Sequence, residues 1–437
     1  MPRLARLALL VLPLLLLVRP GSAVDRHKFR TCEQTGFCRN YRPTTAERPR
    51  VGELLAGEVR ATEPGVLSSG GVSLRCLASG AVRLRAVEPT PRWETSDILR
   101  DVSLGRWDAS APATWTCAGD VSTSRVRVST APWLQVELFG ASDAHEPVLV
   151  WGQRGLSYFE RTLAGSSAAA ESGASSTTAR ALDAAGEAAR KIVGWGEDGK
   201  PVYEGGEHDA ERPEGGAEEP ASKAPTSDRA APETFGGFTD PKPRGPQSVG
   251  FDATFFGDAQ LYGLPEHASN FSLRNTNGAG ADAYSEPFRL FNLDVFEYEL
   301  NEPMALYGAV PFVVARSASR GLVSGVLLNN PSETFVDVST DERAPSRRHT
   351  MWMSESGVLD VFLFPGPTLA GVLDAYTRVT GRPMLPPLFA TAYHQCRWNY
   401  RDERDVEEVH AKFEELDFPV DVICEWWCGG GGARCSD

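Results

Sequence analysis

The sequence predicts a mainly β chain that passes into an α/β segment near its C-terminal end. Three observations support this fold class. Short apolar or alternating runs, separated by Gly, Pro, Ser and Asp, recur over residues 24–163 and again over 234–366. Residues 164–233 between them are rich in Ala, Gly, Ser, Glu and Pro and poor in large apolar side chains. A strand, helix and strand pattern then covers residues 388–423.

The first residues predict a secretory signal peptide at 1–23. A basic segment with Arg3 and Arg6 precedes an apolar run at 7–18 and small residues at 21–23. This run is too short to span a bilayer, and no later stretch is long and apolar enough, so we expect no membrane span after signal cleavage. The net charge of −14 argues against nucleic acid or an anionic membrane surface as a partner.

The β-rich regions on both sides of residues 164–233 predict one antiparallel sandwich, interrupted by an insert. The predicted strands lie at 72–77, 81–86, 124–128, 134–139, 148–151, 310–315, 322–329 and 358–364. The insert itself cannot bury enough apolar surface to offset its ordering entropy, so we expect residues 164–233 to be disordered.

A helix is predicted where the sandwich ends. Pro367 and Thr368 open it, and Gly381 stands where a helix ends most easily. Its apolar stripe consists of Leu369, Val372, Leu373, Tyr376 and Val379. We expect this helix to lead into the α/β segment.

The α/β segment predicts a βαβ unit. Residues 388–393 have the composition of a buried strand, and Asp402 can cap the helix that follows. That helix has a predicted buried face with Val406, Val409, Phe413 and Leu416, and residues 420–423 form a second strand. Strand, crossover helix and parallel strand make one unit of a (β/α) barrel, in which working groups sit at the C-terminal ends of the strands.

Four motifs give the chain a resemblance to a known family. They are HQCRWNY at 394–400, YGLPEHA at 262–268, RLFNLDVFEYEL at 289–300 and LYGAVPF at 306–312. With these motifs the chain resembles glycoside hydrolase family 31, in its branch of endoplasmic-reticulum α-glucosidases, from about residue 27 to residue 423. The resemblance implies a galactose-mutarotase-like sandwich, followed at 367–423 by a linker helix and the start of a (β/α)8 catalytic barrel.

The resemblance also implies an activity and its setting. The activity is the removal of α-1,3-linked glucose from the N-glycans of newly made glycoproteins, with retention of the anomeric configuration. Two carboxylates carry out this reaction, and it needs no cofactor. In this branch of the family a lectin-like second subunit holds the catalytic subunit in the endoplasmic-reticulum lumen. We therefore expect an N-glycan substrate, a lectin-like partner and lumenal residence.

Three site residues follow from the resemblance residue by residue. Asp294 and Phe296 match an aspartate and an aromatic residue on a sandwich loop that reaches over the barrel mouth, and Trp398 matches an aromatic wall of the −1 subsite. A carboxylate can accept paired hydrogen bonds from sugar hydroxyls, and an aromatic face suits the C–H face of the ring. Without the resemblance, Asp294 reads as a turn residue and Trp398 as a core residue.

The family's catalytic acids are not found in the sequence. Both are aspartates on later barrel strands, the nucleophile in a Trp-x-Asp-Met-Asn-Glu-like run, and no such run occurs in residues 1–437. After Ile423, Cys424-Glu425 stands where the family has a Trp-Leu-Asp-Ile-Glu-like run. We expect 424–437 to be an aberrant tail from a retained intron or shifted frame, and this chain to be inactive. The alternatives are a natural short form that binds carbohydrate without catalysis, and an unrelated secreted lectin.

The cysteines are those of an oxidising compartment. Cys32 and Cys38 can close a small loop, and the resemblance implies that they form a disulfide. Cys76 and Cys117 either pair across a sheet or remain buried thiols. Asn270, in Asn270-Phe271-Ser272, is the candidate glycosylation site.

Other polar clusters are interpreted as structural. Glu266-His267 could be a metal or acid/base pair, and His394 with Cys396 a catalytic dyad, but adjacent residues diverge and no third group orients the dyad. Cys424, Cys428 and Cys435 lack a fourth ligand at zinc spacing, so no metal site is expected.

Overall fold

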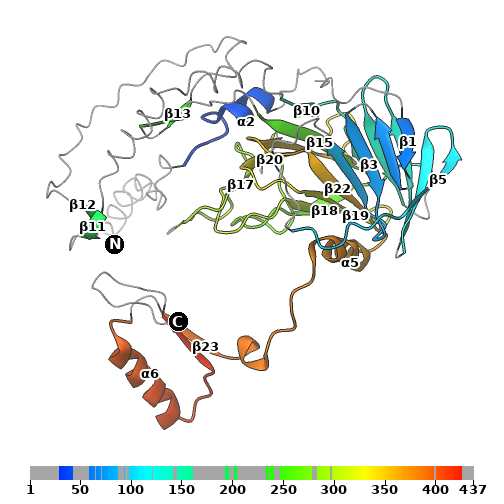
Figure 1. The fold of residues 1–437 in the computed structure, drawn as a ribbon. Helices are drawn as coiled ribbons and strands as arrows, with labels where there is room; N and C mark the ends of the chain where they lie inside the picture. The colour runs from blue at the N-terminus through cyan, green and yellow to red at the C-terminus, as the bar shows by residue number, and fades with distance from the viewer. Residues whose placement is uncertain are drawn as a thin grey trace, which may run out of the picture. The chain divides into compact units, whose positions relative to one another are not determined.

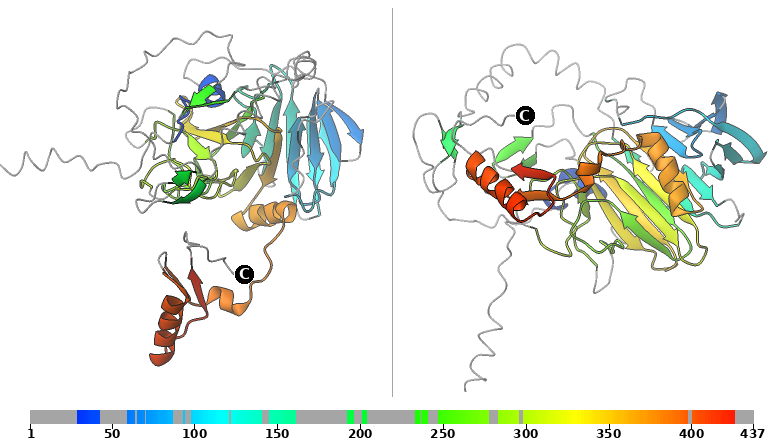
Figure 2. Two further views of the ribbon diagram at one scale, coloured as in Figure 1. Left: turned by 60° about the vertical axis from the view of Figure 1, so that its left-hand side comes forward. Right: turned by 90° about the horizontal axis from the view of Figure 1, so that it is seen from below.

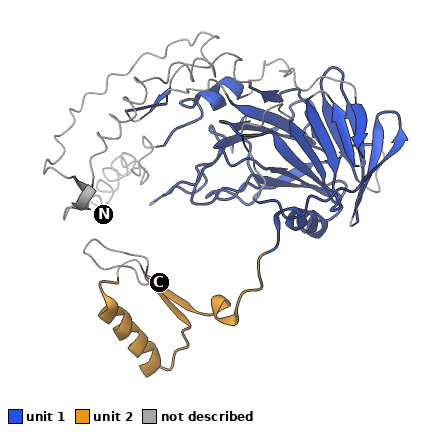
Figure 3. Ribbon diagram, viewed as in Figure 1, with its two compact units in different colours: residues 1–167, 225–382 blue, residues 168–224, 383–437 orange. Residues whose placement is uncertain are grey.

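The computed structural model describes most of the two β-rich regions and the α/β segment. The described residues are 29–42, 59–63, 65–69, 71–86, 93, 98–120, 122–140, 145–160, 192–195, 201–203, 233–235, 237–240, 247–277, 283–295, 298–397 and 400–425. The predicted signal peptide and residues 426–437 lie outside them. The chain divides into two compact units, residues 1–167 with 225–382 and residues 168–224 with 383–437 (Figure 3).

The first unit contains two large antiparallel sheets that face each other (Figures 1 and 2). In order across the first sheet the strands are β1 (Val59–Glu63), β2 (Val66–Ser69), β3 (Val72–Cys76), β4 (Val82–Ala86), β22 (Asp360–Pro365), β19 (Val323–Leu328), β18 (Phe312–Ser317) and β16 (Ala259–Gly263). The second sheet runs β17 (Phe288–Leu290), β20 (Thr334–Thr340), β21 (Arg348–Ser354), β15 (Val249–Phe255), β9 (Leu149–Trp151), β8 (Gln135–Phe139), β7 (Thr123–Ser129), β6 (Thr114–Ala118) and β5 (Arg106–Ala111), with β10 (Tyr158–Phe159) beside β15.

The main core lies between the two sheets. Leu74 and Leu84 of the first sheet and Val136 and Trp352 of the second belong to one cluster of buried apolar side chains. Strand β7 shows how the sequence builds it, because its buried residues alternate with more exposed ones along the pleat. The predicted strands are thus confirmed, with ends that differ by one or two residues.

Strands from both sides of the insert pair directly with each other. Ala253 of β15 pairs with Trp151 of β9, and Leu363 of β22 pairs with Val82 of β4. A single sandwich is therefore formed by both β-rich regions, as the sequence predicts.

The insert is not described as a whole, but short hairpins are present at and inside its borders. Strand β11 (Ile192–Trp195) pairs with β12 (Pro201–Tyr203), and β13 (Glu233–Phe235) pairs with β14 (Phe238–Asp240). The expectation that residues 164–233 lack structure throughout is therefore wrong for β11 and β12. β-branched and aromatic residues stand on both sides of the sequence Gly-Glu-Asp-Gly, a composition that favours a hairpin. The other residues of 164–232 lie outside the described part.

Each sheet is covered on its outer face by a helix of the same unit. Helix α5 (Leu369–Thr380) buries Val372, Ala375 and Val379 against the first sheet, and the Thr368 side chain accepts a hydrogen bond from Gly371 N. The predicted helix is thus confirmed, but Leu369 and Leu373 of its predicted stripe are exposed. The helix packs on the sandwich instead of belonging with the barrel segment. Helix α2 (Gly36–Tyr41) lies on the second sheet in a cluster with Phe335 and Met351.

The second unit contains the predicted parallel βαβ. Strand β23 (His394–Arg397) pairs in parallel with β24 (Val422–Glu425), and helix α6 (Glu403–Glu415) connects them, with the Asp402 side chain accepting from Asp405 N. No helix within the described ranges meets the length and apolar character that a bilayer crossing requires.

Two details of this unit differ from the prediction. Residues 388–393 do not form the first strand: Leu388–Thr391 is a 3-10 turn, and the strand starts at His394. A short apolar run such as 388–393 suits a helical turn as well as a strand, so its composition alone does not decide between them. The predicted buried stripe of α6 is only partly covered, with Leu416 71% exposed. Asp405 is instead the buried residue of this helix.

Candidate functional site

The site begins with the loop that follows β17 and carries Asp294. Asp294 is exposed, while its neighbour Val295 is buried and anchors the loop. Leu293 N donates to Leu306 O at 2.8 Å, and the Tyr307 hydroxyl donates to Val295 O at 3.0 Å. Both residues flanking Asp294 are therefore held by the LYGAVPF segment, which leaves the Asp294 carboxylate facing solvent.

The YGLPEHA segment is hydrogen-bonded to the LYGAVPF segment. Glu266 N donates to Gly308 O at 2.8 Å, and Gly308 N donates to Glu266 Oε2 at 2.8 Å. Val310 N donates to Pro265 O at 2.9 Å. Glu266 thus uses its carboxylate to bind backbone, and the interpretation of this residue as structural is confirmed.

His267 ties the YGLPEHA segment to the start of the Asp294 loop. Its Nδ1 lies 2.5 Å from Leu264 O and its Nε2 lies 2.8 Å from Arg289 O, in β17. The Phe288 ring meets the imidazole edge-on, with ring centroids 5.1 Å apart. Burial lowers the pKa of His267, and the two carbonyl contacts, which favour the protonated ring, oppose that shift. Both ring nitrogens are occupied, so this imidazole positions backbone.

Three of the four motifs found in the sequence therefore form one hydrogen-bonded network. An ion pair fixes its base, since Arg289 Nε lies 2.6 Å from Glu333 Oε1 and both side chains are largely buried. Sequence reasoning missed the roles of His267, Arg289 and Glu333. Only the proximity of three motifs along the chain hinted that they meet, and Glu333 lies outside all of them.

The other two predicted sugar-binding residues, Phe296 and Trp398, lie outside the described residues. Trp398 follows β23 directly, at the C-terminal end of the first barrel strand, where such an enzyme places its working groups. His394 Nε2 lies 3.0 Å from Phe389 O and is exposed. Among the described residues no group of three or more His, Cys, Asp or Glu side chains gathers to hold a metal ion.

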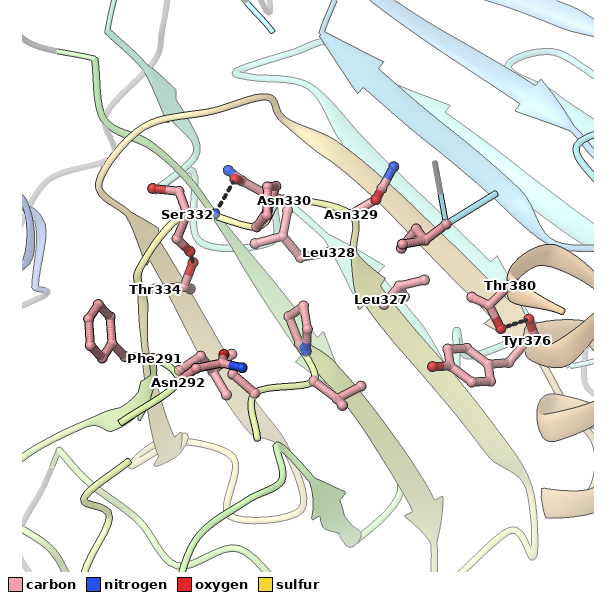
Figure 4. Close-up of a pocket in the computed structure, with 16 residues that line it drawn as sticks. Phe291, Asn292, Leu327, Leu328, Asn329, Asn330, Ser332, Thr334, Tyr376 and Thr380 are labelled. Atoms are coloured by element: carbon pink, nitrogen blue, oxygen red, sulfur yellow. Dashed lines mark hydrogen bonds between the residues drawn. The ribbon is translucent and has the colours of Figure 1, made fainter. Parts of the chain in front are cut away.

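A cavity of about 760 Å³ lies in the first unit beside the base of this loop (Figure 4). It is lined on one side by Leu290, Phe291 and Asn292, and on another by Tyr376 and Thr380 of α5. Asp294 is not among the lining residues. The lining is mainly apolar, and the Asn330 side chain on its wall is engaged in hydrogen bonds to Ser332 N and Ser356 O.

The part of the chain that the structure describes contains two disulfides. Cys32 is joined to Cys38 with Cα atoms 5.1 Å apart, and Cys76 to Cys117 with Cα atoms 5.3 Å apart. The alternative of two free thiols at Cys76 and Cys117 is thereby excluded. Asn270 is exposed in the loop after the YGLPEHA segment, which leaves room for a glycan.

An antiparallel sandwich followed along the chain by a parallel βαβ unit is the domain order of barrel glycoside hydrolases with an N-terminal mutarotase-like domain. Comparison with known families agrees. Residues 71–337 match the glycosyl hydrolase 31 N-terminal galactose mutarotase-like domain, and residues 383–428 match the glycosyl hydrolases family 31 TIM-barrel domain. The chain belongs to glycosyl hydrolase family 31.

Relatives of the chain include proteins named as α-glucosidases. Neutral alpha-glucosidase AB of Mus musculus is 35% identical over 92% of this chain and 42% of its own length. Glucosidase 2 subunit alpha of Schizosaccharomyces pombe is 48% identical over 44% of this chain and 21% of its own length. A crystal structure of a glucosidase II alpha subunit superposes with a TM-score of 0.64 at 26% identity, over 92% of this chain and 42% of that one. The chain spans at most about two-fifths of the length of these relatives.

Proposed function

We propose that this chain is the N-terminal part of a retaining α-glucosidase of the glucosidase II alpha type. The observation that carries the proposal is the network of three motifs that presents Asp294 on a braced loop. In addition, 92% of this chain aligns with neutral alpha-glucosidase AB. The substrate is α-1,3-linked glucose on the N-glycans of newly made glycoproteins.

Asp294, Phe296 and Trp398 supply the sugar-binding groups in this proposal. Asp294 accepts hydrogen bonds from hydroxyls of the terminal glucose, and the two aromatic rings cover its C–H faces. The exposure of Asp294 and the anchoring of both its neighbours support this role, because a fixed carboxylate loses little freedom on binding. Residues 1–437 contain no run of the family's nucleophile type, so in this proposal the chain on its own does not hydrolyse the substrate.

The setting of the enzyme is the lumen of the endoplasmic reticulum. The predicted signal peptide and the two disulfides support a secretory compartment. One solved relative is a heterodimer of the catalytic subunit of glucosidase II and the binding domain of its regulatory subunit. By analogy we assign this chain a lectin-like regulatory partner, and Asn270 as its N-glycosylation site.

The test is hydrolysis by an enzyme in which residues 24–423 are continued into the whole barrel of the family, with a glucose-α-1,3-glucose disaccharide as substrate. We expect release of α-glucose, seen by proton NMR, and a fall in kcat/KM of roughly 10- to 100-fold for Asp294→Asn, because hydrogen bonds to a charged acceptor contribute about 1.5–3 kcal/mol. Glu63→Gln on the exposed edge strand β1 is the matched control and should leave kcat/KM unchanged.

Three results would contradict the proposal. They are an unchanged kcat/KM in Asp294→Asn, β-glucose as the first product, and strong turnover by residues 1–437 alone, which lack the paired acids.

A further inference from the structure

Two thiols lie side by side on the two strands of the second unit. The parallel register pairs Cys396 of β23 with Cys424 of β24. Directly paired residues on neighbouring strands are about 4.8 Å apart and project from the same face of the sheet. That separation lies inside the Cα window of about 4.4–6.8 Å that a disulfide needs.

Both thiols are open to reagents. Cys396 is exposed and Cys424 is partly exposed, whereas the four cysteines of the two disulfides are almost fully buried. Neither side chain has a role in the site described above. We propose that Cys396 and Cys424 form a dithiol site that closes to a disulfide across β23 and β24 by exchange with a small-molecule disulfide of the glutathione type.

The exchange balances without any further reactant. One cysteine thiolate attacks a sulfur of glutathione disulfide, forms a mixed disulfide and releases one glutathione thiolate. The second cysteine thiolate then attacks the protein sulfur of the mixed disulfide and displaces the other glutathione thiolate. The two cysteines are oxidised, the glutathione disulfide is reduced, and the two thiol protons end on the two released glutathione molecules.

The neighbouring thiol affects the first step. The hydrogen bond with Cys424, and the repulsion between two thiolates, raise the pKa of Cys396. Because the thiolate is the attacking species, closure should accelerate as the pH rises above neutrality. The proposal applies to the 437-residue chain, in which Cys424 is present and both thiols are accessible, and it uses the β23 and β24 register and not the proposed glycosidase site.

The experiment uses the whole chain with Cys428→Ser and Cys435→Ser. Cys396 and Cys424 are then its only cysteines outside the two disulfides. The protein is equilibrated with reduced and oxidised glutathione, quenched in acid, alkylated and mapped by mass spectrometry. We expect a cross-linked peptide joining Cys396 to Cys424, with both thiols lost to alkylation together. A lasting glutathione adduct on either cysteine, or two thiols that stay alkylatable throughout, would overturn the proposal.

The matched control moves one thiol to the other face of the sheet. In Gln395→Cys with Cys396→Ser the number of thiols is unchanged, but residue 395 pairs with Ile423 and points away from Cys424. We expect a glutathione adduct to accumulate in this variant, with at least a tenfold loss of the cross-link. Equal closure in both proteins would show that the register is not the cause.

Discussion

His349 is a buried histidine in the second sheet, and its surroundings predict a pH dependence of stability. Its Nδ1 lies 2.8 Å from Thr254 Oγ1, and its Nε2 lies 3.4 Å from Asp341 Oδ2. Burial lowers the pKa of His349 to about 4. The unfolded chain takes up this proton near pH 6.5, so the free energy of unfolding should fall between about pH 6.5 and pH 4, by on the order of 3 kcal/mol.

The measurement is urea unfolding of the sandwich and of His349→Gln at several pH values in that window. The variant should lose part of the pH slope. Burial raises the pKa of Asp252 and Asp337, which makes their contribution to stability increase as the pH falls, but both proteins share these groups. Identical slopes would show that His349 is not the titrating group.

Gly263, in the YGLPEHA motif, has a backbone conformation that is energetically unfavourable for residues with a side chain. Its φ is +114°, and a Cβ there would lie 2.3 Å from Phe312 O. Gly321 has φ +65° with nothing near its Cβ position, so it isolates the effect of backbone conformation. We expect Gly321→Ala to lower the free energy of unfolding by about 1 kcal/mol and Gly263→Ala by on the order of 3 kcal/mol. Chemical denaturation measures both, and equal losses would contradict the clash.

Helix α5 is attached to the first sheet by few side chains, which makes its packing testable. Val372 is fully buried, and the adjacent Leu373 is 41% exposed. Val372→Ala should lower the free energy of unfolding by about 2 kcal/mol through the cavity it leaves, and Leu373→Ala by less than about 0.5 kcal/mol. Similar losses from the two variants in denaturant unfolding would indicate that α5 does not pack on the sheet as described.

The elements that the sequence predicts well are those with a strong local pattern. The alternation in β7 and β8 and the stripe of α5 with its Thr368 cap each give a period that matches one structure. The strand predicted at 388–393 is wrong because a short apolar run suits several structures, and here it forms a 3-10 turn.

The braced loop is not predictable from local patterns. His267 contacts Arg289 through a side chain and a backbone oxygen, and Glu266 contacts Gly308 across the same network. Nothing in periodicity or propensity encodes such long-range polar contacts. Asp294 itself was predicted only through the family resemblance, because an exposed aspartate in a loop is otherwise unremarkable in sequence.

The two compact units should differ in solubility. Met384, Leu385 and Leu388 in the second unit are each more than four-fifths exposed. Large exposed apolar groups favour self-association. We expect residues 24–382 to remain monodisperse, in size-exclusion chromatography with light scattering, at concentrations where residues 24–437 aggregate.

A matched variant tests the cause of that aggregation. Leu385→Ser with Leu388→Ser in the longer chain should restore part of the monodisperse fraction, because both side chains project into solvent. Aggregation of residues 24–382 to the same extent would place the cause in the sandwich.

The pairing of Val82 in β4 with Leu363 in β22 determines when the first sheet can be completed during translation. Strands β1 to β4 are made early, yet the ribosome must pass Pro365 before β22 can dock against them. Through most of translation the nascent hairpins therefore have an open edge with unpaired backbone N–H and C=O groups. Contacts between segments so distant in the chain also form slowly. We therefore expect chaperones to assist folding until the last strand of the sandwich emerges.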